Sequence, residues 1–370
     1  MGRRAASPDE TGVHPRDPSV RCCRVGSAGK ACCCQQRRLT RHHGKSIAIL
    51  FRSSSMACDN SKFPVWLVTF FLLFGCTLLD DHPTGAIEVK YAAPGPQAVT
   101  IAPSSQCCDH RGNSYDLYYP TNLTGAPHAL IAWANGTNAV SNRVSYLLRH
   151  WASWNFVVIA TRDRFTGDGT TVLDSVNFML HANSDPNSIF FHTIDTNHIG
   201  GAGHSQGAGG AIRAMLASNG KIATVIPIEL PGQQFCLCSP NQVLDTASIT
   251  QGSVFFVDGS NDIPISPPTQ PPQEVGEQSL AAFYAAVPSN VPKLTATLLG
   301  PTHNDVTGQP GCNTAAPPCL VGVYGYLGYP TAWMADRLGL DPTAHAAFVS
   351  GTGEIFSQTS HWAFVQSNIQ

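Results

Sequence analysis

Residues 199–211 constrain this chain most, because Gly203-His204-Ser205-Gln206-Gly207 fits the pattern G-x-S-x-G. That pattern is typical of a nucleophile elbow, in which a strand turns sharply into a helix and holds a serine at its apex. A Cβ at either glycine would crowd the backbone of such a turn. The context agrees, since residues 197–202 can form a short buried strand and residues 208–216 favour a helix. We therefore predict that Ser205 is a catalytic nucleophile.

The N-terminal part of the 370-residue chain differs from the rest. Residues 1–55 contain eleven Lys or Arg and five Cys with little apolar periodicity, which indicates a disordered or non-native extension. Residues 56–76 are typical of a signal peptide, because an apolar run at 63–79 follows a short polar lead. Leu73-Phe74-Gly75-Cys76 is similar to a bacterial lipobox, and ordinary cleavage nearby is the alternative. We expect a protein that is secreted or lipid-anchored at the outer surface.

Charge and cysteine content limit the partners of the exported part. Residues 1–76 hold 12 of the 22 basic and 4 of the 24 acidic residues, so the remainder carries a net charge of about −10. Such an acidic domain is not suited to nucleic acid. An even number of cysteines in an exported protein favours disulfides, although the sequence does not fix their pairing. Because no Cys-x-x-Cys pair occurs at finger spacing, we expect no metal site. The six cysteines are Cys107, Cys108, Cys236, Cys238, Cys312 and Cys319.

Strand and helix patterns alternate along the rest of the chain. Proline-rich residues 77–105 indicate a linker or an edge segment rather than part of the core. Residues 106–370 indicate one α/β domain with a mainly parallel sheet covered by helices on both faces. Only 22 residues separate the strands ending at 230 and starting at 253, too few for a helical lid domain. Predicted strands lie at 114–119, 128–134, 156–160, 197–202, 223–230, 253–257 and 294–299, the last of them. Predicted helices lie at 141–155, with Ser141 as N-cap, and at 171–180, 208–216, 278–286 and 331–338, which closes the domain.

A serine nucleophile requires a base and an acid, which follow it in the order acid, then histidine, at the ends of later strands. The strand at 253–257 leads into a loop with two carboxylates. We choose Asp262, because it lies beyond the Gly259 turn, and keep Asp258 as the alternative. His303 follows directly after the strand at 294–299 and is the predicted base.

The oxyanion formed during ester cleavage requires two backbone N–H donors. Gln206, the residue after the serine, is predicted to supply one. The second is expected from the loop Asn135-Gly136-Thr137-Asn138, from Thr137 or its neighbour Asn138.

The order and spacing of these motifs resemble one family over residues 106–350. Asn135-Gly136-Thr137, the elbow, Gly259-Ser260-Asn261-Asp262, Pro301-Thr302-His303 and Ala332-Trp333-Met334 follow one another as in the α/β-hydrolases related to cutinases and polyester (PET) hydrolases. The resemblance implies the α/β-hydrolase fold and a secreted carboxylic-ester hydrolase that needs no cofactor. Its triad would be Ser205, Asp262 and His303, with Thr137 and Gln206 forming the oxyanion hole.

Departures from the family concern the substrate pocket. The family usually has methionine at Gln206, an aromatic residue at Thr137 and tryptophan at Gly232, so the aromatic clamp for a terephthalate ring is poorly supplied. His204 and Gly232 are the expected substrate-binding positions. Some relatives have a disulfide that joins the loop before the acid strand to the loop after the histidine. Cys236 or Cys238 could pair with Cys312 or Cys319 in this way.

We expect a monomeric serine esterase with no required protein partner, acting on an ester substrate that includes polymers such as cutin or polyester. A short-chain or lipid esterase is the alternative within the class. A non-catalytic α/β-hydrolase binding module is the alternative outside it, and it is disfavoured because every catalytic element is present.

Overall fold

The computed structural model describes residues 83–104, 107–235 and 243–370. The predicted extension 1–55, the signal peptide 56–76 with Cys76 and the first residues of the predicted linker lie outside these ranges. None of the helices within them is long and apolar enough to span a membrane.

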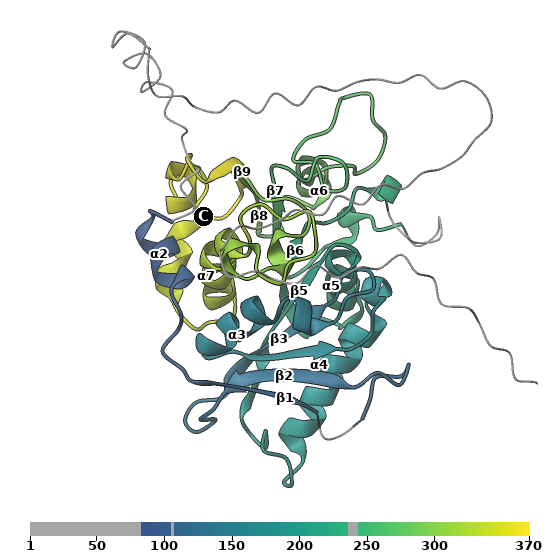
Figure 1. The fold of residues 1–370 in the computed structure, drawn as a ribbon, viewed down its shortest axis with the longest axis vertical. Helices are drawn as coiled ribbons and strands as arrows, with labels where there is room; N and C mark the ends of the chain where they lie inside the picture. The colour runs from purple at the N-terminus through teal and green to yellow at the C-terminus, as the bar shows by residue number, and fades with distance from the viewer. Residues whose placement is uncertain (1–82, 105–106, 236–242) are drawn as a thin grey trace, which may run out of the picture. The chain divides into compact units, whose positions relative to one another are not determined.

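Nine strands form one sheet in the order β1-β2-β4-β3-β5-β6-β7-β8-β9 (Figure 1). The strands from β3 to β8 pair in parallel, whereas β1 and β2 at one edge and β9 at the other join antiparallel. Parallel pairing aligns the carboxyl ends of the central strands at one edge of the sheet, where ligands bind in such folds. The strands are β1 (Val99–Pro103), β2 (Tyr115–Pro120), β3 (His128–Ala134), β4 (Val157–Thr161), β5 (Ile194–His204), β6 (Ile222–Ile228), β7 (Ser253–Gly259), β8 (Lys293–Leu298) and β9 (Trp362–Ser367).

Helices cover both faces of this sheet, as the sequence predicts. Helices α2, α3 and α7 pack on one face, and α4, α5 and α6 on the other (Figure 1). The alternation of side chains along a strand divides β3 between the two layers: Trp133 joins one core and Leu130 the other. The helices are α2 (Ala86–Ala92), α3 (Ser145–Ser153), α4 (Thr170–Ser184), α5 (Gln206–Ala217), α6 (Leu280–Ala286) and α7 (Gly328–Arg337).

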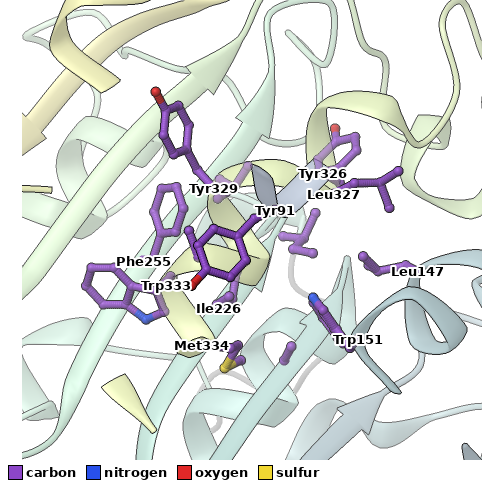
Figure 2. Packing of buried hydrophobic residues seen from close by; sticks show 14 of the residues in the cluster. Tyr91, Leu147, Trp151, Ile226, Phe255, Tyr326, Leu327, Tyr329, Trp333 and Met334 are labelled. Atoms are coloured by element: carbon purple, nitrogen blue, oxygen red, sulfur yellow. The ribbon is translucent and has the colours of Figure 1, made fainter. Parts of the chain in front are cut away.

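Large aromatic side chains fill the core beneath α7. Figure 2 shows Trp333 of α7 beside Phe255 of β7, with ring centroids 5.4 Å apart. The Trp333 indole N–H is satisfied by Thr224 Oγ1 on β6 at 2.8 Å. This packing explains the Ala332-Trp333-Met334 motif: it fixes α7 to the central strands whose ends carry the site.

Three predictions about the two ends of the domain are wrong. The segment 77–105 is not only a linker, because α2 places Tyr91 in the core and β1 extends the sheet. The strand at 294–299, observed as β8, is not the last, since β9 pairs with it. For the same reason, the helix at 331–338, observed as α7, does not close the domain. These segments are too short to give a clear period in the sequence, and their structure depends on packing against distant elements.

The predicted helix 141–155 begins later than expected. A 3₁₀ turn at Ser141–Arg143 precedes α3, and Val144 rather than Ser141 is its N-cap residue. The Ser141 hydroxyl instead donates to Asp116 at 2.5 Å. The prediction that no lid follows residue 230 concerns a segment of which 236–242 lie outside the described residues, and it stays a prediction.

Candidate active site

The elbow between β5 and α5 has the geometry that its glycines indicate. Ser205 has φ 57° and ψ −129°, a strained conformation of the kind found at functional sites. A Cβ at Gly203 would lie 2.3 Å from the carbonyl oxygen of Gly207. A Cβ at Gly207 would lie 2.3 Å from the carbonyl oxygen of Ala134 on β3. Only glycine allows the helix to approach the strands this closely, so the turn presents Ser205 at the carboxyl edge of the sheet.

The structure brings together the three residues predicted as a triad. Ser205 Oγ lies 2.9 Å from His303 Nε2, and His303 Nδ1 lies 2.5 Å from Asp262 Oδ2. These residues follow β5, β7 and β8, so parallel pairing of neighbouring strands aligns them. Asp262 is 2 % exposed. A carboxylate at Nδ1 leaves Nε2 as the acceptor for the serine proton, which is the arrangement that activates a hydroxyl.

The structure also decides between the two candidate carboxylates, because Asp262 and not Asp258 bonds to His303. Asp258 is still on β7 and fully buried, and burial raises its pKa well above the ordinary range. Asp262 lies beyond the turn, with its N–H bonded to the Gly259 carbonyl at 3.0 Å.

The loop that carries His303 is fixed by Asp305. This buried carboxylate accepts hydrogen bonds from the Thr302 N–H at 2.9 Å and from the Val321 and Gly322 N–H groups at 2.6 and 2.7 Å. It therefore ties the two ends of the segment 302–322 together. A disulfide between Cys312 and Cys319 closes a smaller loop within this segment. The pairing of Cys312 or Cys319 with Cys236 or Cys238, which the resemblance implied, is wrong.

The two predicted oxyanion donors lie at the start of α5 and in the loop after β3. Gln206 is the first residue of α5, where N–H groups have no acceptor within the helix. Thr137 follows Gly136, whose backbone is so close to the elbow that a Cβ would lie 2.8 Å from His204 Nδ1. The alternative donor, Asn138, is engaged elsewhere, since its N–H donates to the Arg164 carbonyl at 2.9 Å. The geometry therefore favours Thr137 over Asn138.

A cavity of about 800 Å³ opens beside Ser205. Its lining is mainly apolar and includes a few charged side chains, and the size is that of a pocket for a small molecule or a substrate segment. Phe165, in the loop after β4, is 56 % exposed and was not identified from the sequence. The sequence feature that could have identified Phe165 is its position after a buried strand, at the same edge of the sheet as the serine. The lining includes Phe165, Ser205, Gln206, Arg213, Leu230, Phe235 and Leu244.

Neither of the two residues predicted to bind substrate lines the cavity. His204 is buried and does not line the cavity; its Nε2–H donates to the His303 carbonyl at 2.7 Å. Burial, with the neighbouring His303, lowers the pKa of His204 to about 3, so its ring is neutral. Gly232 faces away from the cavity, because a Cβ there would lie 2.9 Å from the Gln278 carbonyl oxygen. His204 thus supports the loop of His303, and Gly232 is set by backbone packing.

Glu229 is a further residue of the site that sequence reasoning missed. It follows β6 directly and is fully buried next to Asp262. A carboxylate after the buried strand 222–228, at the edge that carries Ser205, was the available signal. Within the described residues, Glu229, Asp262 and His303 have potential metal-ligand atoms within 4.8 Å of one another, but the Nδ1–H of His303 already faces Asp262. The arrangement is that of a hydrogen-bonded chain.

A protein-family model matches part of this chain. Residues 80–235 match the family model PETase, described as PET hydrolase-like. The matched segment contains α2, the oxyanion loop and the elbow, and it begins within the predicted linker, in agreement with the role of α2 and β1 in the domain. The resemblance seen in the sequence is confirmed over these residues, and the fold is that of an α/β-hydrolase. The match supports an ester hydrolase of the cutinase or polyesterase type.

Proposed function

We propose that this protein is an exported serine carboxylic-ester hydrolase that works through a covalent acyl-enzyme. The observation that carries the proposal is the unbroken hydrogen-bond chain from Ser205 through His303 to Asp262. A serine hydroxyl is a poor nucleophile in water, and this chain supplies the base and the counter-charge that it requires.

The reaction follows from the positions of these atoms. Ser205 Oγ attacks the ester carbonyl carbon while His303 Nε2 takes the hydroxyl proton. The Gln206 and Thr137 N–H groups stabilise the oxyanion of the tetrahedral intermediate. His303 then returns the proton to the leaving alcohol, and a water molecule activated by the same nitrogen hydrolyses the acyl-enzyme. Asp262 remains ionised and stabilises the imidazolium that forms in each half-reaction.

Two classes of ester fit the surroundings of Ser205. Exposed apolar side chains at the cavity, Phe165 and Phe235, suit an extended hydrophobic polymer such as cutin or polyester. The cavity itself has the volume of a small-molecule pocket, which favours a short-chain or lipid esterase as the second candidate. Export is proposed on the apolar run at 63–79 alone, and a secreted or lipid-anchored location is consistent with a substrate outside the cell.

The test is hydrolysis of p-nitrophenyl esters of increasing acyl length, and of an aromatic and an aliphatic polyester film, by the protein and by Ser205→Ala. We expect Ser205→Ala to reduce kcat by roughly 10⁴-fold or more, since the nucleophile is removed. Release of soluble products from a film identifies the polymer class, and a preference for short soluble esters with no release identifies the second candidate. A folded protein whose turnover on every substrate is unaffected by Ser205→Ala would refute the mechanism. No turnover at all would instead favour a non-catalytic binding module.

A further inference from the structure

A second carboxyl group lies behind the Asp262–His303 pair. Glu229 is fully buried, follows β6, and has φ 51°, a left-handed conformation that is strained for a residue with a side chain. Its own N–H donates to the Val257 carbonyl on β7 at 2.8 Å, and this bond holds the Glu229 backbone beside β7. Its carboxyl group lies beside that of Asp262, with an oxygen of each within 4.8 Å of the other. Within the described residues, Glu229 Oε2 is buried and receives no hydrogen bond from a donor group.

The hydrogen bonds around Glu229 fix where a proton must be. Tyr326, a fully buried residue before α7, donates its hydroxyl proton to Glu229 Oε1. Asp262 Oδ2 accepts the proton of His303 Nδ1. Two carboxylates cannot hydrogen-bond to each other unless one of them is protonated, because an ionised carboxylate is only an acceptor. The proton therefore belongs on Glu229, because Asp262 is the carboxylate that bonds directly to His303, which becomes cationic during catalysis.

The charges around Glu229 agree with a proton on this residue. Among the described residues, the groups that act on its pKa are Asp262, Asp258 and Tyr326, and none of these is a lysine or arginine. His303 also has a ring nitrogen within 4.8 Å, but that histidine hydrogen-bonds to Asp262. Asp305 acts on Tyr326 and is not among the groups that act on Glu229, and His204, which bonds to the His303 carbonyl, is neutral. Burial and the two neighbouring aspartates raise the pKa of Glu229 well above the ordinary range.

We propose that Glu229 is a neutral carboxylic acid that donates a hydrogen bond to Asp262 and is a positioning residue for the Asp262–His303 pair. The proposal rests on the esterase function above and adds a residue to it. A neutral donor orients the Asp262 carboxylate and stabilises its charge without a second negative charge beside His303. Tyr326 in turn holds the Glu229 carboxyl group, so the chain of hydrogen bonds runs Tyr326–Glu229–Asp262–His303–Ser205.

Two substitutions separate this role from a merely structural one. Glu229→Gln is neutral at every pH and keeps both contacts, since its amide oxygen accepts from Tyr326 and its NH₂ group donates to Asp262. Glu229→Leu removes the donor at a similar volume. The readout is the pH profile of kcat/KM on a soluble p-nitrophenyl ester, whose acid limb reports the pKa of the base. Glu88→Gln, at another buried carboxyl group on α2, is the matched control and should leave the acid limb unmoved.

We expect Glu229→Gln to keep kcat within about threefold and the acid limb in place, because neither the charge nor the donor changes. In Glu229→Leu, Asp262 loses a donor and pairs more strongly with the imidazolium. Its kcat should fall roughly 10- to 100-fold with little change in KM, and the acid limb should move to higher pH. If Glu229 were ionised, Glu229→Gln would remove a negative charge near His303 and shift the acid limb down by about one pH unit or more. That shift, or a Glu229→Leu enzyme with normal kcat and profile, overturns the proposal.

Infrared spectroscopy tests whether Glu229 is protonated, independently of catalysis. At about pH 8, the difference spectrum between the protein and Glu229→Gln should contain the carbonyl band of a protonated carboxyl group. Absence of that band refutes a neutral Glu229 even if the esterase function is correct. Its presence in a protein without Ser205-dependent turnover would mean that the proposed function, and not the protonation of Glu229, has failed.

Discussion

Replacing Glu88 by Gln should make the stability of this protein less sensitive to alkaline pH. Glu88 lies on α2, is 2 % exposed, and accepts a hydrogen bond from the Trp362 indole N–H on β9 at 2.7 Å. Its neighbour Glu354 accepts the Ile87 and Glu88 N–H groups at the start of α2. Burial, opposed by the Trp362 bond and reinforced by Glu354, raises the pKa of Glu88 from 4.5 to about 7. The carboxyl group is therefore held in a place that favours its neutral form.

The size and sign of the effect follow from these two pKa values. The folded state binds the Glu88 proton more tightly than the unfolded state, so the stabilisation is complete below the unfolded pKa and is lost as pH rises through about 7. The full difference between the folded and unfolded pKa of Glu88 corresponds to ~3 kcal/mol in the free energy of unfolding, at ~1.4 kcal/mol per pKa unit. Between about pH 5 and pH 8, Glu88→Gln should gain roughly 2–3 kcal/mol relative to the unsubstituted protein, because the amide never ionises.

Urea unfolding of both proteins at several values across this pH range measures the effect. The control is Glu274→Gln on an exposed loop, whose stability relative to the unsubstituted protein should not vary with pH. Parallel stability curves for Glu88→Gln and the unsubstituted protein would show that α2 does not hold Glu88 in an environment that disfavours its charge. The account of how α2 docks on α7 and β9 would then be wrong.

Two substitutions test the local geometry. Gly207→Ala places a Cβ 2.3 Å from the Ala134 carbonyl oxygen, so helix α5 must shift from β3; we expect a loss of about 1–3 kcal/mol in the free energy of unfolding, measured in urea against Gly112→Ala. Gly112 has open space around its Cβ position, though its positive φ makes alanine there mildly strained. Substituting both Cys312 and Cys319 by Ser opens a loop with a sequence separation of 7 and should cost ~2.5 kcal/mol. If the double variant is as stable as the unsubstituted protein, and if the unsubstituted protein is equally stable with and without reductant, the Cys312–Cys319 disulfide is contradicted.

Much of the site could be read from the sequence because it depends on local geometry. The two glycines that flank Ser205 are required by one tight turn, and turn requirements act over a few residues. His303 and Asp262 were found because each follows a β-branched or apolar strand. The choice between Asp262 and Asp258 was harder, since the two are close in sequence and only the structure shows that β7 extends through Asp258 and that Asp262 reaches His303.

Other parts of the site depend on contacts between distant segments. Glu229 and Tyr326 are 97 residues apart, and no local pattern joins them. His204 was predicted to contact substrate, whereas its ring is buried and faces His303, because a residue beside the nucleophile can point into the protein as easily as out of it. Gly232 was matched to a tryptophan of the family by its position in the sequence alone. In the structure, the Gln278 backbone lies so close that it limits which side chain can fit at this position. Helix α2 was missed because a seven-residue helix is stabilised by its docking and not by its own propensity.

The sequence by itself determined the α/β class, the order of most strands and helices, and the identity of the serine, histidine and acid. These features follow from hydrophobic periodicity and from turn chemistry, both of which act within a few residues of the chain. Only the tertiary structure decided which residue lies behind the Asp262–His303 pair, where the cavity opens, and how the terminal segments complete the sheet. Those features depend on which side chains are excluded from water together, and desolvation of a group such as Glu229 is a property of the folded protein and not of its neighbours in the chain.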